Sequence, residues 1–197
     1  MSMPMTNISA SPSWQRLADA ASYALTIHAE QRRKGTDIPY ISHLFAVASL
    51  VMEHSGDEDL AIAGMLHDAI EDVGAEQEAI IAERFGARVA AVVRACTDAD
   101  TLPKPPWRAR KEAYIHHLES ADRDTLLVSC ADKLHNARAI LTDVRTHGVA
   151  LFDRFNVGRD GVLWYYAQLA EMFARRLPGA LSRELANVVD QMQVEGV

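Results

Sequence analysis

Six side chains in the first two thirds of the sequence have the chemistry of a metal-dependent active site. Two imidazoles and two carboxylates come from three separated segments, and a second acidic pair follows closely after the middle segment. The first four are His43, His67, Asp68 and Asp132, and the acidic pair is Glu71 and Asp72. Imidazoles and carboxylates are common ligands of divalent metal ions, so the acidic pair is expected beside the metal rather than on it. The sequence therefore suggests a metal-dependent hydrolase.

The spacing of the central residues predicts that one helix presents them together. Side chains four apart share a helix face, which places His67 over Glu71 and Asp68 over Asp72. The segment from residue 60 to 70 is otherwise apolar, and ionisable groups are costly to bury there unless they are paired or bound to a metal. A lone His-Asp dipeptide more often makes local hydrogen bonds at the surface. The metal interpretation gains support because Asp132 also follows an apolar run.

Composition indicates one globular domain. The chain has 197 residues, 49% of them hydrophobic, with seven prolines and ten glycines, which is enough for one full core and unlike a disordered or fibrous chain. We expect a poorly ordered or disordered N-terminus over residues 1–13 and the domain over residues 14–195. No apolar run has the length of a signal peptide or a membrane span, so a cytoplasmic protein without membrane contact is expected.

Charge limits the partners. The net charge of −7 disfavours a nucleic-acid binder, because phosphate neutralisation needs an excess of basic residues on one face. A small polyanion remains compatible with two local basic clusters, although such runs are more often solvated surface. These clusters are Arg32, Arg33 and Lys34, and Lys104, Arg108, Arg110 and Lys111. Cys96 and Cys130 form no C-x-x-C pattern, so reduced, buried thiols are expected.

Apolar residues recur mostly at spacings of three and four residues, and runs of alternating apolar and polar residues are scarce. This pattern predicts an all-α fold. Asp57 is an N-cap candidate, and Gly56 and Gly74 are candidate stops. Residues 148–161 are expected to be irregular. The expected helices cover residues 14–31, 43–53, 57–72, 76–84, 87–96, 107–119, 123–147, 162–176 and 178–194. The aromatic run from Trp164 to Tyr166 is compatible with either core or cavity wall.

In the order of its motifs the chain resembles the HD-domain metal-dependent phosphohydrolases. Within them it is similar to the hydrolase domain of the Rel/SpoT-type alarmone enzymes and to the small alarmone hydrolases. The matching segments are residues 28–34, 39–43, 63–72, 85–89, 97–98 and 131–138. The resemblance covers about residues 16 to 142 and fades after Leu141. It implies a single-domain HD-type helical bundle, and the chain length implies a stand-alone hydrolase.

Carried over residue by residue, the resemblance implies a role for each matched side chain. The implied metal ligands are His43, His67, Asp68 and Asp132, the implied catalytic pair is Glu71 and Asp72, and the implied substrate contacts are Arg33, Lys34, Lys104 and Asn136. The implied cofactor is Mn²⁺ or another divalent metal. The expected substrate is a small nucleotide, guanosine tetra- or pentaphosphate, which loses its 3′-pyrophosphate to give GDP or GTP.

Two alternatives stay open at this point. One is an HD phosphohydrolase of another nucleotide, such as an adenosine alarmone, a nucleoside 5′-monophosphate or a 2′-phosphorylated cofactor. The other is a module that binds metal or nucleotide without turnover, which Glu71 and Asp72 argue against because binding alone needs no carboxylate pair beside the metal. The sequence leaves open a homo-oligomer and the roles of Arg154, Arg159 and the aromatic run.

Overall fold

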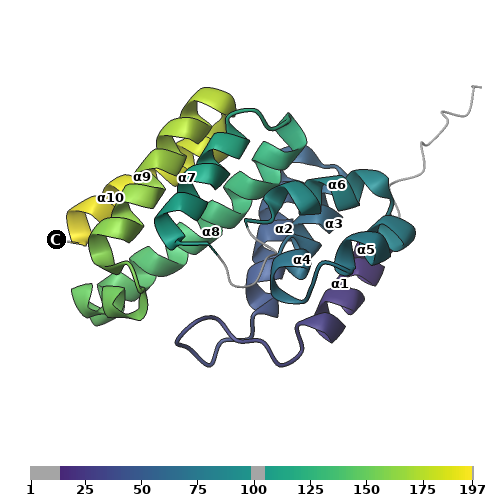
Figure 1. Ribbon diagram of the computed structural model, residues 1–197, viewed down its shortest axis with the longest axis horizontal. Coiled ribbons are helices and arrows are strands. Elements are labelled where there is room, and N and C mark those ends of the chain that lie inside the picture. The colour runs from purple at the N-terminus through teal and green to yellow at the C-terminus, as the bar shows by residue number, and fades with distance from the viewer. Residues whose placement is uncertain (1–13, 99–104, 197) are drawn as a thin grey trace, which may run out of the picture.

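A computed structural model shows an all-α protein and describes residues 14–98 and 105–196 (Figure 1). Ten α-helices and one 3-10 helix lie in these ranges. They are α1 (Gln15–Ile27), α2 (Ile41–Ser55), α3 (Glu58–Leu66), α4 (Ala69–Asp72), α5 (Gln77–Phe85), α6 (Ala87–Cys96), α7 (Trp107–Leu118), α8 (Arg123–His147), η1 (Val149–Arg154), α9 (Gly158–Arg176) and α10 (Ala180–Glu195). The predicted fold class, a single-domain helical bundle, is confirmed.

Helix α8 is the central element of the bundle. Its 25 residues run between two groups of helices, α1 to α6 on one side and α7, α9 and α10 on the other (Figure 1). Thirteen of its residues, from Thr125 to Val144, are buried, because helices pack against it from both sides. Asp122 begins the helix by accepting the Thr125 amide at 2.8 Å, as expected of an N-cap carboxylate.

Helices α2 and α3 pack closely, and this contact sets the position of two predicted ligands. A Cβ on Gly64 would lie 3.3 Å from both the Ala48 Cα and the Val51 Cγ2, so a small residue is needed where the helices cross. Asp57 caps α3 by accepting the Leu60 amide at 3.3 Å, as predicted. His43 near the start of α2 and His67 at the end of α3 are thereby brought together.

The prediction of one helix over residues 57–72 is wrong at a single point. Helix α3 ends at Leu66, and α4 begins at Ala69. The His67 Nδ1 lies 2.8 Å from the Gly64 carbonyl oxygen, which would accept the amide of residue 68 in a continuous helix. The His67 side chain thus occupies the carbonyl oxygen that the next helical hydrogen bond would use. The helix ends there, and the chain turns at His67 and Asp68. Asp72 still lies one helical turn after Asp68, as predicted, because its backbone amide donates to the Asp68 carbonyl at 2.9 Å.

Two further boundaries differ from those expected. The first helix ends at Ile27 instead of residue 31, and the loop that follows is drawn together by a bridge between Arg32 and Pro39. The segment expected to be irregular contains η1, and α9 begins already at Gly158. Cys96 and Cys130 are buried free thiols, as predicted. No helix in the described ranges is both long enough and apolar enough to cross a bilayer.

Candidate functional site

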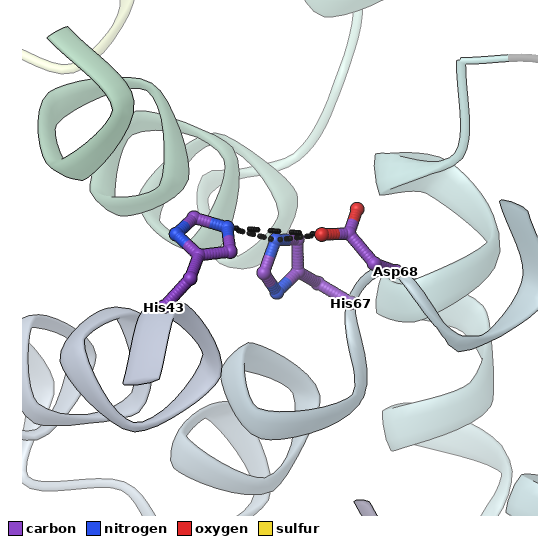
Figure 2. Close-up of side chains that lie close together, drawn as sticks. All are labelled: His43, His67 and Asp68. Atoms are coloured by element: carbon purple, nitrogen blue, oxygen red, sulfur yellow. Dashed lines mark hydrogen bonds and ion pairs between the residues drawn. The ribbon is translucent and has the colours of Figure 1, made fainter. Parts of the chain in front are cut away.

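The predicted metal ligands of three separated segments lie together in the core. His43, His67 and Asp68 each offer one donor atom, and these atoms lie within 4.8 Å of one another (Figure 2). The Nε2 atoms of His43 and His67 are 3.3 Å apart. The Asp68 Oδ2 lies 3.0 Å from the His67 Nε2 and 3.7 Å from the His43 Nε2. The Asp132 Oδ1 is 3.2 Å from the His43 Nε2 and 3.5 Å from the His67 Nε2.

These separations fit ligands of one cation. Two atoms bound at about 2.1 Å to the same metal are about 3.0 Å apart at right angles and about 3.4 Å apart at the tetrahedral angle. The two imidazoles are almost completely buried, with 0% exposure for His43 and 2% for His67. A mixed nitrogen and oxygen donor set of this kind suits a divalent metal.

The hydrogen bonds of the imidazoles fix which nitrogen faces the site. His67 donates from Nδ1 to the Gly64 carbonyl, so in the neutral imidazole its Nε2 carries the lone pair. The Arg33 guanidinium can only donate, and it lies 3.5 Å from the His135 Nδ1, which makes that nitrogen an acceptor. His43, whose Nδ1 is 2.8 Å from the same atom, must therefore donate to it. Both Nε2 lone pairs point at the same place, as metal coordination requires.

The electrostatics of the cluster also call for a positive charge. Burial lowers the pKa of His67, but the charge of Asp68 and hydrogen bonds to Asp132 and Asp68 outweigh it and raise this pKa well above its usual value. Burial raises the pKa of Asp132, yet the Lys133 ammonium and the two imidazoles hold it well below the usual range. The buried Asp132 and the partly buried Asp68 thus stay ionised around the imidazoles, and a divalent cation would satisfy them better than one proton.

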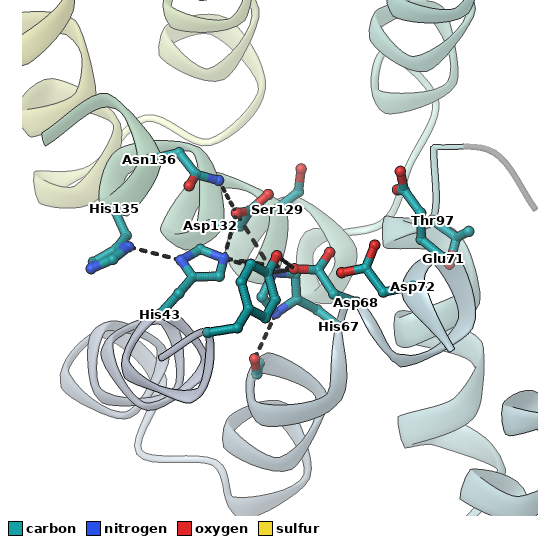
Figure 3. A network of polar contacts seen from close by, with 12 residues as sticks. His43, His67, Asp68, Glu71, Asp72, Thr97, Ser129, Asp132, His135 and Asn136 are labelled. Atoms are coloured by element: carbon teal, nitrogen blue, oxygen red, sulfur yellow. Dashed lines mark hydrogen bonds and ion pairs between the residues drawn. The ribbon is translucent and has the colours of Figure 1, made fainter. Parts of the chain in front are cut away.

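Several side chains hold the four donors in place (Figure 3). The Tyr40 hydroxyl donates to the Asp68 Oδ2. The Asn136 amide nitrogen donates to the Asp132 Oδ1 at 2.6 Å, and the Lys133 Nζ lies 2.6 Å from the Asp132 Oδ2. Burial and the charges of His43 and Arg33 lower the pKa of His135 to about 4, so it remains a neutral acceptor near pH 7. Such contacts orient ligands and tune their basicity.

The acidic pair lies next to the donors, but its two members face different surroundings. In Figure 3, Glu71 and Asp72 lie beyond Asp68 on the side away from His43. Asp72 accepts the Gln31 amide at 2.7 Å, and burial and the Asp68 charge raise its pKa. Glu71 accepts the Asp98 amide at 3.3 Å and faces a cavity. The prediction that one helix face carries all four polar side chains therefore needs correction, because the helix break intervenes.

A cavity of about 520 Å³ lies along α8, and we call it the Asn136 cavity. Its wall contains His135 and Asn136, which contact the predicted ligands His43 and Asp132. Three of the predicted substrate contacts, Arg33, Lys34 and Asn136, are in its wall. Arg33 donates to the Asn136 side-chain oxygen at 2.9 Å, and the Lys34 ammonium lies 5.9 Å from the centre of the Phe155 ring. Asn136 thereby connects the cavity to the ligand Asp132. Lys104, the fourth predicted contact, lies outside the described residues.

A second cavity of about 490 Å³ lies on the Glu71 side of the site, and we call it the Arg110 cavity. Its wall includes Arg110 and Lys111 from α7. Both belong to the basic cluster that the sequence leaves open as either a binding site for a small polyanion or solvated surface. Arg108 from the same cluster is exposed, pairs with Glu112 and lies over the Trp164 ring. The two cavities share four lining residues. These are Lys34, Ile140, Phe155 and Tyr166.

Sequence reasoning missed several residues of this site. Tyr40 and His135 lie in the segments that match the family motifs, residues 39–43 and 131–138. Each is three residues from a predicted ligand, and this closeness in sequence is the signal that could have identified them. Arg154 and Tyr166 come from the part of the chain where the resemblance fades, and they line the Asn136 cavity. The aromatic run is partly cavity wall, because Tyr165 and Tyr166 are buried and both line the Arg110 cavity.

An all-α bundle that gathers two His and two Asp around one point, with a basic cavity on each side, has the organisation of a metal-dependent phosphohydrolase. The family model described as HD domain matches residues 20–163. The chain belongs to the HD-domain family, as its motifs predicted, and this family implies a divalent metal at the His-Asp cluster.

Among curated relatives, the guanosine-3′,5′-bis(diphosphate) 3′-pyrophosphohydrolase MESH1 of Xenopus tropicalis is 37% identical over 125 residues, which are 62% of this chain and 68% of the relative. The MESH1 of Drosophila melanogaster is 31% identical over 134 residues, which are 66% of this chain and 73% of the relative. A solved structure, described as a metazoan ortholog of SpoT that hydrolyses ppGpp, superposes with a TM-score of 0.75 at 25% identity and covers 93% of this chain and 98% of its own.

Proposed function

We propose that this protein hydrolyses guanosine 3′,5′-bis(diphosphate) and its pentaphosphate homologue at the 3′-pyrophosphate, releasing pyrophosphate and GDP or GTP. The observation that carries the proposal is the arrangement of two Nε2 lone pairs and two ionised carboxylates around one point, with Glu71 and Asp72 next to it. The relatives named for this activity support the choice of substrate.

The proposed ligands of the metal are His43, His67, Asp68 and Asp132, and the proposed metal is Mn²⁺. Carboxylate oxygens suit Mn²⁺, and imidazole is common to several transition metals, so the set accommodates Mn²⁺ without thiolates. When bound, a divalent cation polarises a phosphoryl oxygen and lowers the pKa of water. Asn136, Tyr40 and the neutral His135 keep the ligands oriented.

The proposed task of Glu71 and Asp72 is to position the attacking water and take its proton. Burial and the nearby Asp68 charge raise the pKa of Asp72, which makes its carboxylate a stronger base than a fully solvated one. The Gln31 amide donates to Asp72 and holds one of its oxygens in place. Hydrolysis adds the elements of water across the bond between the 3′ oxygen and phosphorus, so the 3′ oxygen leaves as a hydroxyl group.

The Asn136 cavity is the proposed place of the nucleoside. Apolar and aromatic side chains in its wall offer a surface for a base, and Arg33 and Lys34 offer positive charge between this cavity and the metal donors. Phe155 is close enough to Lys34 for the ammonium to lie against its ring. Small-molecule sites commonly combine apolar walls with a few placed polar groups.

Replacing Arg33 and Lys34 together by Ala is expected to raise KM by about 10-fold or more, because charge-assisted contacts to phosphate are lost. A smaller fall in kcat is expected, since Arg33 also bonds Asn136. Steady-state kinetics on the guanosine substrate measure both constants. Arg32→Ala is the matched control, because Arg32 is exposed and is not in the wall of the cavity. An unchanged KM in the double variant would show that the two cations serve only as solvated surface.

The experiment that tests the function is a hydrolysis assay with Mn²⁺ on a panel of nucleotides. The panel contains guanosine tetra- and pentaphosphate, the corresponding adenosine compounds, a nucleoside 5′-monophosphate and a 2′-phosphorylated dinucleotide, with phosphate and pyrophosphate measured separately. We expect pyrophosphate release from the guanosine compounds at the highest kcat/KM. A higher value on another compound, or no turnover, would replace this proposal. The cytoplasmic location, a homo-oligomer and the boundaries of the domain remain predictions.

A further inference from the structure

His28, the residue that ends α1, is a buried histidine outside the metal cluster. The residue is 3% exposed, and its Nε2 has no hydrogen-bond partner among the described residues. A buried nitrogen without a partner is destabilising, and an apolar side chain of similar size would avoid that cost. What favours histidine over an apolar residue at this position is therefore the contact of its other nitrogen, Nδ1.

The Nδ1 atom of His28 begins a chain of two hydrogen bonds that ends at Asp72. It lies 2.5 Å from the Gln31 Oε1, and the Gln31 Nε2 donates to the Asp72 Oδ2 at 2.7 Å. An ionised carboxylate can only accept, so the Gln31 amide must present its nitrogen to Asp72 and its oxygen to His28. His28 consequently donates from Nδ1 to Gln31.

The bond from His28 fixes the orientation of the Gln31 amide. A glutamine amide carries an acceptor on one side and a donor on the other, and a turn of 180° exchanges them. In the turned orientation the amide oxygen would face the Asp72 carboxylate and repel it. The Nδ1–H donor behind Gln31 favours the orientation that binds Asp72, and a bond to one carboxylate oxygen leaves the other oxygen available to an attacking water.

The place of Asp72 in the chain makes such a partner necessary. Asp72 is the last residue of the four-residue helix α4, it is exposed, and it lines a surface groove together with Gln31 and Val73. An exposed side chain at the end of a short helix has several staggered conformations open to it. Because a catalytic group displaced by about 1 Å can lose about 10²-fold in rate, a fixed donor to this carboxylate bears directly on turnover.

The same segment also contacts a residue that holds a metal ligand. The centre of the His28 ring lies 5.7 Å from the centre of the Tyr40 ring, and the Tyr40 hydroxyl donates to Asp68. The Tyr40 backbone amide donates to the Gln31 carbonyl at 3.0 Å. Gln31 and Tyr40 are thus bonded to each other, and they reach Asp72 and Asp68 respectively from one closed loop behind which His28 packs.

We propose that His28 is a positioning residue for hydrolysis, which acts through Gln31 to orient the Asp72 carboxylate towards the attacking water. This inference rests on the proposed function, in which Asp72 belongs to the catalytic pair. His28 is not in the wall of the Asn136 cavity or of the Arg110 cavity, and it is not one of the proposed metal ligands. Its loss should therefore lower kcat and leave KM and metal content almost unchanged.

Single-turnover and steady-state assays of the metal-loaded protein test this role, on the nucleotide of the panel with the highest kcat/KM. His28→Leu is expected to lower kcat about 2- to 10-fold and Gln31→Met about 10-fold or more, as for one lost bond between neutral groups and one lost bond to a charged group. His28→Asn keeps an N–H donor near the place of Nδ1 and should recover part of the loss. Gln15→Met is the matched control, because Gln15 makes a similar bond to Asp19 on the exposed face of α1.

A double-mutant cycle shows whether His28 and Gln31 act through Asp72. In the Asp72→Asn background, His28→Leu and Gln31→Met should lower kcat no further. A histidine that only stabilises the fold would lower the Tm and leave kcat at the wild-type value at full metal occupancy, and this result would overturn the proposal. Equal losses of kcat with and without Asp72→Asn would overturn it as well.

The cycle also separates this inference from the proposed function. If Asp72→Asn loses turnover while His28→Leu and Gln31→Met keep the wild-type kcat, the positioning role alone is refuted. If Asp72→Asn itself keeps the wild-type kcat, the proposed base is wrong and the positioning role falls with it. Gln31 is only partly buried, so Gln31→Met and His28→Asn decide the question even if His28→Leu does not fold.

Discussion

The variant His67→Ala is expected to lose its bound metal and nearly all hydrolysis. His67 supplies one of the two Nε2 atoms at the centre of the site, and its Nδ1 is bonded to the Gly64 carbonyl. The alanine side chain has no atom that could bind a metal ion. Removing contacts that merely orient a ligand costs about 10- to 100-fold in metal affinity, and loss of a ligand should exceed this. Metal content by mass spectrometry and turnover on the guanosine substrate measure the two effects.

Thermal unfolding gives a second measurement of the same prediction. A ligand that binds only the folded state stabilises it by mass action, so a chelator should lower the Tm of the wild-type protein. The same chelator should leave the Tm of His67→Ala almost unchanged. His116→Ala is a suitable control, because this histidine is exposed on α7, away from the cluster. If purified His67→Ala retained a full equivalent of tightly bound metal, the assignment of the ligands would be wrong.

Most of the site could be predicted because its chemistry is encoded in short motifs. His67 and Asp68 are adjacent, and Asp132 and Asn136 are four apart on one helix, so local spacing alone places each pair together. The convergence of the three segments depends on packing between α2, α3 and α8, which no local pattern specifies. The resemblance to a family supplied that step, and the structure brings the four predicted ligands together.

The helix break between α3 and α4 could not be read from apolar periodicity. Periodicity reports which face of a helix is buried, and the segment is apolar on almost every face, so it carries no signal for an end at Leu66. The cause is a hydrogen bond from the His67 side chain to the Gly64 carbonyl. A competing side-chain bond of this kind depends on rotamer and on neighbouring helices, which the sequence does not show.

The cavities were the least predictable part of the site. Their walls combine the loop after α1, the start of α7, the middle of α8 and the segment around η1, which are far apart in sequence. The basic cluster around Arg110 illustrates the limit. Its members divide between an exposed pair with Glu112 and a cavity wall, and only the position of each side chain around α7 decides between them.

The different surroundings of Glu71 and Asp72 bear directly on the enzyme's chemistry. Asp72 is held by Gln31 and its pKa is raised by burial and by Asp68, whereas Glu71 faces the Arg110 cavity. A pair arranged in this way can contact both an attacking water and the phosphate group that the water attacks. Two nearby carboxylates also share their titration, so the pair is the unit to be tested.

The double variant Glu71→Gln with Asp72→Asn is expected to lower kcat about 10²- to 10⁴-fold, the range for loss of a general acid-base group. The amides keep size and hydrogen-bonding capacity but cannot take a proton, and neither residue is a proposed ligand, so metal content and nucleotide affinity should change little. Single-turnover assays at equal metal occupancy measure the effect, and Glu78→Gln on α5 is the matched control. Turnover near the wild-type rate in the double variant would place the base elsewhere and favour a role for the pair in holding the Gln31 side chain and the Asp98 backbone amide.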